Sequence, residues 1–188
     1  MSKLLPTLLC AAVLAAAQPL SATGAAPPDR SALVAFGAVA PEIKGLVLNG
    51  ERGMKLTGFR GRVVVVDFWA TWCGPCLQAM PELDRLRTEL ADLGWGDRFE
   101  VVGVSVDSDI PRARQFLERV GIGYPVFGDP LSIVMKQWGP WKLPATFLLD
   151  ADGRVQMIWL GYADYFGADI KAKALEQLRR LDAPSAPP

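Results

Sequence analysis

The sequence predicts an α/β protein in which helices cover both faces of a mixed sheet. Two apolar, β-branched runs, residues 63–69 and 99–106, are each followed by a stretch in which apolar residues recur at helical spacing. Two further apolar runs, 145–149 and 155–160, are separated by the turn sequence at 151–153. The sheet therefore combines strands joined through helices with a C-terminal hairpin.

The first residues are typical of an export signal rather than of a folded domain. Lys3 precedes the almost wholly apolar stretch Leu4 to Ala17, and a stretch rich in Pro, Ser, Gly and Ala follows. A membrane helix needs about 20 apolar residues, and this run is shorter. We expect a signal peptide over 1–25 that is cleaved, which places the protein in the periplasm or another exported compartment. A retained N-terminal membrane anchor is the alternative.

The remaining chain is long enough for one domain with its own core. We expect a linker rich in Ala and Pro over 26–41, a domain over 42–182 and a flexible tail over 183–188. The domain begins with a short hairpin formed by 46–50 and 54–56. The strand 63–69 is apolar throughout, which is typical of a central strand covered on both faces.

A long helix is expected after this first strand. Pro81 should kink it, and Gly94 and Gly96 should end it. Its inward positions are expected to be Leu77, Met80, Leu83, Leu86, Leu90 and Leu93.

Three further helices are predicted. One begins at Pro111 and stops at Gly121, and a short one begins at Asp129-Pro130. A terminal helix covers 165–181. The expected inward residues of the first are Ala113, Phe116, Leu117 and Val120. Those of the second are Ile133, Val134 and Trp138, and those of the third are Ile170, Ala174, Leu175 and Leu178.

Composition excludes several classes of function. The sequence has 20 basic residues (Lys and Arg) and 20 acidic residues (Asp and Glu), so its formal net charge is +0. There is no excess of positive charge that would favour binding to nucleic acid or to an anionic membrane surface. The sequence contains 0 histidines, which removes Ser-His-Asp and Cys-His nucleophilic sites and His-ligated zinc or copper.

Cys73-Gly74-Pro75-Cys76 follows the first strand directly and is the strongest functional signal. An exposed thiol pair at the start of a helix suits thiol–disulfide exchange, because backbone N–H groups there stabilise a thiolate. Removal of the leader also removes Cys10, which leaves this pair alone. The alternatives are a static disulfide or a zinc half-site, but a closed zinc site needs four ligands. We expect a redox site with no cofactor and no metal.

Two longer stretches carry a resemblance to a known family. They are residues 61–76, followed by Pro81 and Leu83, and residues 143–150, followed by Asp152-Gly153. In both, the sequence resembles the exported TlpA/ResA-like thiol–disulfide oxidoreductases of the thioredoxin fold. The resemblance covers nearly all of 42–182 and includes a strand–helix insertion at about 99–121. It implies a thioredoxin fold with an N-terminal hairpin and that insertion.

The thiol pair has two expected roles. Cys73 is the expected nucleophile, and Cys76, one turn into the helix, should be shielded and resolve the mixed disulfide. Gly74 and Pro75 hold the two sulfurs within bonding reach and face the substrate.

Other residues are expected to contact the substrate. The resemblance implies that Pro144 is cis and faces the thiols, and that the backbone of Leu143 pairs with substrate. By itself, Leu-Pro before a strand could be an ordinary edge-strand proline. We expect Trp72 and Trp141 to form the surface around the site, and Trp138 to belong to the core.

Asp67 is an unusual residue for an apolar strand, because a buried carboxylate needs a partner or a raised pKa. Thioredoxin has an Asp at the matching point that accepts a proton from the second cysteine. TlpA/ResA-like proteins more often have Asn there and a Glu at the position of Ala79. We therefore expect Asp67 to take the proton of Cys76. The alternative is an ion pair with Lys55, Arg62 or Lys142.

Taken together, these signals predict an exported disulfide reductase that acts on disulfide-containing proteins and receives electrons from a membrane donor. The resemblance implies cytochrome c maturation or the reduction of metal-site thiols. We expect a monomer that does not bind nucleic acid. An oxidase or isomerase on the same fold is the first alternative. A Cu(I) chaperone is a less favoured alternative, because the sequence has no His and no Met cluster near the thiol pair. A peroxiredoxin is also disfavoured, because it would normally use a lone cysteine.

Overall fold

The computed structural model describes residues 33–50 and 52–182. The expected leader over 1–25, Cys10, the first part of the linker and the tail over 183–188 lie outside the described residues. Residues 33–41, the remaining part of the linker, lie against the domain. Val34 N–H donates to the carbonyl of Trp138, and Val39 forms an isolated β-bridge with Arg154.

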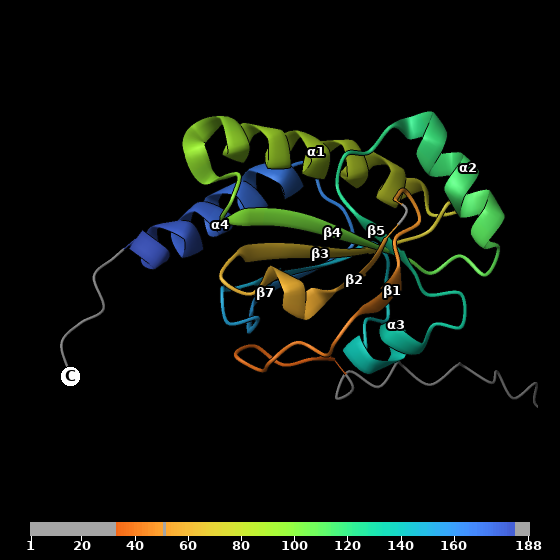
Figure 1. The fold of residues 1–188 in the computed structure, drawn as a ribbon, viewed down its shortest axis with the longest axis horizontal. Helices are drawn as coiled ribbons and strands as arrows, with labels where there is room; N and C mark the ends of the chain where they lie inside the picture. The colour runs from red at the N-terminus through yellow and green to blue at the C-terminus, as the bar shows by residue number, and fades with distance from the viewer. Residues whose placement is uncertain (1–32, 51, 183–188) are drawn as a thin grey trace, which may run out of the picture.

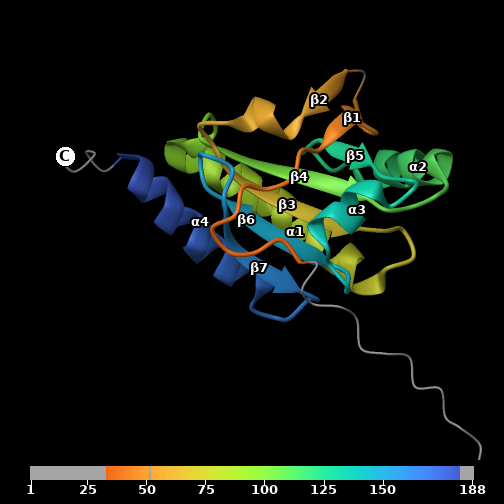
Figure 2. The ribbon, with the colours of Figure 1, turned by 90° about the horizontal axis from the view of Figure 1, so that it is seen from below.

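A five-stranded mixed sheet forms the centre of the molecule (Figure 1). Its strand order is β5-β4-β3-β6-β7, which Figure 2 shows. β3 (Val63–Trp69) pairs in parallel with β4 (Phe99–Ser105) and antiparallel with β6 (Ala145–Leu149). β5 (Val126–Gly128) and β7 (Val155–Leu160) are the outer strands. Every residue of β3 is buried, as expected for a central strand covered on both faces.

Alternation along β3 separates two apolar layers. Val63, Val65 and Trp69 pack in a core cluster with α1 (Gly74–Leu90), α2 (Ile110–Val120) and α4 (Phe166–Asp182). Val64, Val66 and Phe68 face the other way, toward α3 (Ile133–Trp138) and the 3-10 helix η2 (Leu56–Phe59). Figure 1 shows α1 above the sheet and α3 below it. The predicted α/β architecture, with helices on both faces of a mixed sheet, is confirmed.

The N-terminal hairpin is confirmed with shifted bounds. β1 (Lys44–Leu46) and β2 (Gly53–Lys55) pair antiparallel in a sheet of their own. Val47 and Leu48 do not continue this hairpin, because Val47 bridges Phe127 and Leu48 N–H donates to the carbonyl of Val126 over 2.6 Å. Residues 47–48 therefore extend the main sheet beyond its outer strand β5. β5 itself was not predicted from the sequence.

The helices begin and end near the predicted residues. α1 runs without interruption through Pro81 and passes into the π-helical turn η3 (Ala91–Trp95), where Gly94 adopts φ 90°. α2 ends at Gly121, whose φ is 70°. α3 begins at Ile133, later than expected, and the carboxylate of Asp129 accepts from the Ile133 and Met135 N–H groups.

Four predicted core positions are wrong. They are Leu77, Leu93, Val120 and Ile133, all of which are exposed. Each lies near a helix end or beyond the edge of the sheet, where helical spacing continues but no partner layer covers the side chain. Within the described ranges, none of the helices combines the length and apolarity needed to span a bilayer.

Candidate active site

Cys73 and Cys76 form a disulfide at the start of α1, with an S–S distance of 2.04 Å and Cα atoms 5.3 Å apart. Cys76 is fully buried, as expected for a shielded second thiol. Cys73 is only 6% exposed, so the expectation of an exposed pair is wrong. Cys73 packs into the core cluster next to Ala70 and Cys76, which leaves little of it in contact with solvent.

The local sequence places Cys73 at the helix N-terminus. Cys73 is the N-cap of α1, and its sulfur accepts a hydrogen bond from the Cys76 N–H over 3.3 Å. Pro75 occupies the first turn, where a missing N–H costs nothing. No acidic side chain lies in that first turn to oppose a thiolate. The helix N–H groups and macrodipole can therefore stabilise negative charge on Cys73.

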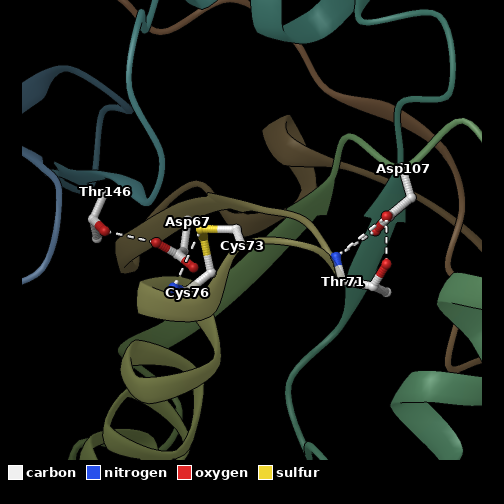
Figure 3. The surroundings of a disulfide bond; sticks show 6 residues. All are labelled: Asp67, Thr71, Cys73, Cys76, Asp107 and Thr146. Atoms are coloured by element: carbon white, nitrogen blue, oxygen red, sulfur yellow. Dashed lines mark hydrogen bonds between the residues drawn. A yellow bond between two sulfur atoms is a disulfide. The ribbon is translucent and has the colours of Figure 1, made fainter.

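Asp67 lies on the same face of β3 as Val65 and Trp69, the face that α1 covers. Its Oδ1 accepts a 2.6 Å hydrogen bond from the hydroxyl of Thr146, which is its direct cross-strand neighbour on β6. Among the described residues, Oδ2 has no hydrogen-bond partner. Figure 3 shows the carboxylate lying between Thr146 and the disulfide.

Burial dominates the electrostatics of this carboxylate. Complete burial raises the pKa of Asp67 from 3.8 to about 7, and the hydrogen bond from Thr146 opposes part of that rise. No ion pair with Lys55, Arg62 or Lys142 occurs in the part of the chain that the structure describes. The carboxyl group can therefore take up or release a proton near neutral pH behind the buried cysteine.

A wall of aromatic side chains encloses the other side of Asp67. Its cross-strand neighbour on β4 is Gly103, and a Cβ built there would lie 3.2 Å from Trp69 Nε1 and 3.2 Å from Tyr124 Cε2. Burial, and after it the negative charge of Asp67, raise the pKa of the Tyr124 hydroxyl well above its ordinary value. The glycine thus lets two large rings occupy the space beside the carboxylate and keep it from water.

Leu143 and Pro144 are joined by a cis peptide bond directly before β6, which confirms the expected isomer. The antiparallel pairing of Phe68 with Ala145 places Pro144 opposite Trp69, the last residue of β3, at the end of the sheet where α1 begins. Pro144 is buried, and its carbonyl accepts from Gly161 N–H over 2.7 Å. Leu143 is half-buried against both core clusters.

The tryptophans divide as expected between surface and core. Trp72, next to Cys73, is 66% exposed, and Trp141 is 39% exposed. Trp138 is fully buried and packs edge-on against Phe147. Gly74 and Pro75 are exposed beside Trp72, whereas Ala79 is fully buried one turn after Cys76.

A second buried carboxylate was missed by the sequence analysis. Asp107 follows β4, and Thr71, which follows β3, donates to it through both its N–H and its hydroxyl (Figure 3). The available signal was an Asp two residues after the apolar strand β4, whereas Asp67 drew attention because it lies within such a strand. Thr146 and Gly103 were also missed, because strand register cannot be read from one strand alone.

The larger cavities lie elsewhere. One of about 590 Å³ is lined by residues between the N-terminal hairpin and α3, including Pro41, Gly128 and Ile133. Over residues 33–50 and 52–182, no group of three or more His, Cys, Asp or Glu side chains is arranged to hold a metal ion.

Comparisons with known proteins agree with this geometry. A profile of the AhpC/TSA family matches residues 36–158. Thiol-disulfide oxidoreductase ResA of Geobacillus thermodenitrificans is 35% identical over 128 residues, which cover 68% of this chain and 71% of that protein.

Two solved structures share the fold. One is a structure from Chlorobium tepidum that is described as a putative thiol:disulfide interchange protein DsbE. It is 29% identical to this chain with a TM-score of 0.70, and the match covers 77% of this chain and 99% of that one. The other, a secreted thiol-disulfide isomerase from Corynebacterium glutamicum, is 26% identical with a TM-score of 0.66, covering 77% of this chain and 86% of its own. The chain therefore belongs to the AhpC/TSA family and is a thiol–disulfide oxidoreductase of the thioredoxin fold, similar to ResA.

Proposed function

We propose that this protein is an exported disulfide reductase in which Cys73 attacks, Cys76 resolves and Asp67 accepts the proton of Cys76. The observation that carries the proposal is the placement of the pair. Cys73 caps α1 and keeps a small exposed fraction, whereas Cys76 is buried on the side of Asp67.

The steps balance as a two-electron exchange. The Cys73 thiolate attacks one sulfur of a substrate disulfide, which forms a mixed disulfide and releases the first substrate thiolate. Cys76 then loses its proton to Asp67 and attacks the Cys73 sulfur. The second substrate thiolate leaves, the protein is left as the Cys73–Cys76 disulfide, and the substrate has gained both electrons.

Asp67 suits the second step because its pKa is raised by burial to about 7. A base is most effective when its pKa lies near the working pH. A buried thiol has no water to accept its proton, so a carboxylate in the same enclosed space provides the path.

Several features support the reducing direction and an exported setting. The dipeptide Gly74-Pro75 lacks the histidine that stabilises the thiolate in the strong oxidants of this fold. The leader over 1–25 supports export, and one solved relative is described as secreted. An exported reductase needs a membrane donor of electrons, and cytochrome c maturation or metal-site assembly would supply disulfide-bonded substrates.

Exposed surfaces support a protein substrate. Trp72, Trp141, Gly74 and Pro75 are exposed, and we place all four in the docking surface. We place the half-buried Leu143 and the buried Pro144 at the base of the same surface. Isomerase activity is the second candidate, because the Corynebacterium glutamicum structure is described as an isomerase.

The redox potential of the pair and the reduction of insulin test the proposal together. Equilibration with glutathione or dithiothreitol should give a redox potential of about −270 mV, the value of thioredoxin. A potential of about −120 mV would contradict the reductase assignment. Cys73→Ser should abolish insulin reduction. Cys76→Ser should accumulate a mixed disulfide through Cys73, which mass spectrometry detects. Accumulation through Cys76 in a Cys73→Ser variant would reverse the assigned roles.

A further inference from the structure

Asp107 is a buried carboxylate to which the proposed exchange mechanism assigns no role. It is 3% exposed and follows the C-terminal end of β4. None of the ion pairs found in the described ranges involves it. A buried carboxylate is costly unless other groups satisfy it, so its partners indicate what it does.

Those partners lie on the segment that leads to Cys73. Asp107 Oδ2 accepts from the Thr71 N–H over 2.9 Å, and Oδ1 accepts from the Thr71 hydroxyl over 2.7 Å. The hydroxyl of Ser105, on β4 itself, donates to Oδ2 over 2.9 Å. Hydrogen bonds to an ionised acceptor are about twice as strong as those between neutral groups.

The bonds connect the ends of two neighbouring parallel strands. Thr71 follows β3, and Cys73 comes two residues later as the cap of α1. The backbone adds two links in this region, from Val106 N–H to the Trp69 carbonyl over 2.9 Å and from Cys73 N–H to the Ala70 carbonyl over 3.1 Å. The turn over 70–73 is therefore held to β4 at Thr71 and closed on itself at Cys73. Figure 3 shows this link on the opposite side of the disulfide from Asp67.

We infer that Asp107 is a positioning residue for the nucleophile: through Thr71 it holds the 70–73 turn so that the Cys73 sulfur stays at the N–H groups that begin α1. The inference rests on the proposed function, because it takes Cys73 to be the attacking thiol. It assigns Asp107 no contact with the substrate or with the reacting sulfurs.

Two effects of the carboxylate on Cys73 have opposite signs, which makes the inference testable. As a nearby negative charge alone, Asp107 would disfavour the thiolate, so its removal would increase Cys73 reactivity. As a clamp, Asp107 keeps the sulfur where the helix N-terminus stabilises the thiolate, so its removal would decrease that reactivity.

The test is the alkylation of the reduced, full-length protein by iodoacetamide at pH 7, with peptide mapping to assign each modified cysteine. Asp107→Ala removes both acceptor oxygens and the charge. Asp107→Asn removes the charge and replaces one oxygen with an NH2 group, but it keeps an acceptor oxygen for the Thr71 N–H, and its NH2 group can donate to the Thr71 hydroxyl. Asp109→Asn is the matched control. Asp109 lies in the same loop, its side chain is exposed, and its carboxylate caps α2 by accepting from the Arg112 N–H. Asn caps helices equally well, so this variant changes the charge without loss of the cap.

The clamp predicts that Asp107→Ala slows alkylation of Cys73 by about threefold or more, because the thiolate fraction falls. It predicts that Asp107→Asn retains most of the wild-type rate and that Asp109→Asn is unchanged. Equal acceleration in Asp107→Ala and Asp107→Asn would overturn the inference in favour of a charge effect. Unchanged rates in folded variants would overturn it in favour of a role in stability alone.

Thr71→Val decides the question if Asp107→Ala does not fold. It removes the hydroxyl bond at constant charge, so slower alkylation of Cys73 supports the clamp, and an equal or faster rate overturns it. The wild-type reaction separates this result from the proposed function. If mapping shows that Cys73 is not the thiol alkylated first in the wild type, the assignment of the nucleophile fails before any variant is compared.

Discussion

Asp67 has two carboxylate oxygens in different situations. Oδ1 accepts from Thr146, whereas Oδ2 has no hydrogen-bond partner among the described residues, although the side chain is completely buried. Burial of an unpaired charge is costly, so the protonated form is favoured up to about pH 7. The same environment that makes the carboxylate costly makes it a proton acceptor suited to neutral pH.

Asp67→Asn should therefore slow the resolution of the mixed disulfide. We expect a loss of roughly 10- to 100-fold at pH 8, since positioned acid–base groups contribute about that much or more. Cys73 alkylation should remain nearly intact because the helix N-terminus is unchanged. Stopped-flow measurement of the release of a substrate thiol gives the resolution rate.

Two comparisons make this result specific to Asp67. Asp92→Asn removes an exposed carboxylate after the far end of α1 and should leave resolution unchanged. Thr146→Val removes the bond that lowers the Asp67 pKa, so the rise of the resolution rate should move to higher pH. Wild-type resolution kinetics in Asp67→Asn at every pH would contradict the proton-acceptor role.

The raised pKa of Asp67 also predicts how stability depends on pH. Between about pH 4 and 7 the folded state binds a proton at Asp67 that the unfolded state has released, so the free energy of unfolding falls as pH rises. At pH above 7 this loss reaches roughly 4 kcal/mol by the conversion of a pKa shift to free energy. Asp67→Asn should abolish this pH-dependent loss of the free energy of unfolding.

Urea unfolding of the oxidised protein at a series of pH values measures this effect. Asp67→Asn and the wild type should be similarly stable near pH 3 and diverge as pH rises, with the variant more stable at pH 8. Parallel curves over the whole range would show that the carboxylate has a solvated or compensated environment in the folded state.

At the scale of elements, the pairing of β3 with β4 builds the enclosure of Asp67. Gly103 stands opposite Asp67 on β4, and a Cβ there would lie 3.0 Å from Val126 Cγ2 and 3.2 Å from both Trp69 Nε1 and Tyr124 Cε2. These neighbours are themselves buried, so they have little room to move.

Gly103→Ala should lower the free energy of unfolding by about 1–3 kcal/mol, the typical cost of overpacking. Gly58→Ala is the matched control, because Gly58 is exposed and an added Cβ would meet nothing within 4 Å. Chemical denaturation of the two oxidised variants provides the comparison. Equal stability of both variants would mean that the strands and Tyr124 adjust without cost.

Elements were predictable where their signals are local. The strands over 63–69, 145–149 and 155–160 have the predicted bounds because β-branched runs and a turn sequence define them. β5 has three residues, too few for a periodic signal, and it is defined by pairing with β4 and by the bonds to Val47 and Leu48. Helix ends marked by Gly94 and Gly121 were also found, because both adopt positive φ.

At the scale of the whole molecule, cleavage of the proposed leader over 1–25 would determine which cysteines the working protein contains. If the leader is cleaved, Cys10 is lost with it and only the Cys73–Cys76 pair remains. A secreted protein with no third thiol has no competing partner for its redox pair.

Expression of the full-length chain in a Gram-negative host should yield protein in the periplasm whose N-terminus lies within residues 23–26. After reduction and denaturation it should titrate two thiols per chain, as Cys73 and Cys76 alone require. Intact-mass measurement and N-terminal sequencing provide the check. Recovery of the intact leader, with three thiols in the membrane fraction, would instead indicate the retained anchor.

The sequence alone determined the class of chemistry and most of the frame: a thiol pair at a helix N-terminus, a carboxylate within a buried strand, and a proline before the third long strand. These signals are local, since each depends on residues within a few positions of one another. Only the tertiary structure decided that Thr146 is the partner of Asp67, 79 residues away, and that Asp107 holds Thr71 across 36 residues. Strand register and helix packing bring such distant side chains together, and neither can be read from one segment of the chain. Burial, which raises the pKa of Asp67, is likewise a property of the assembled layers.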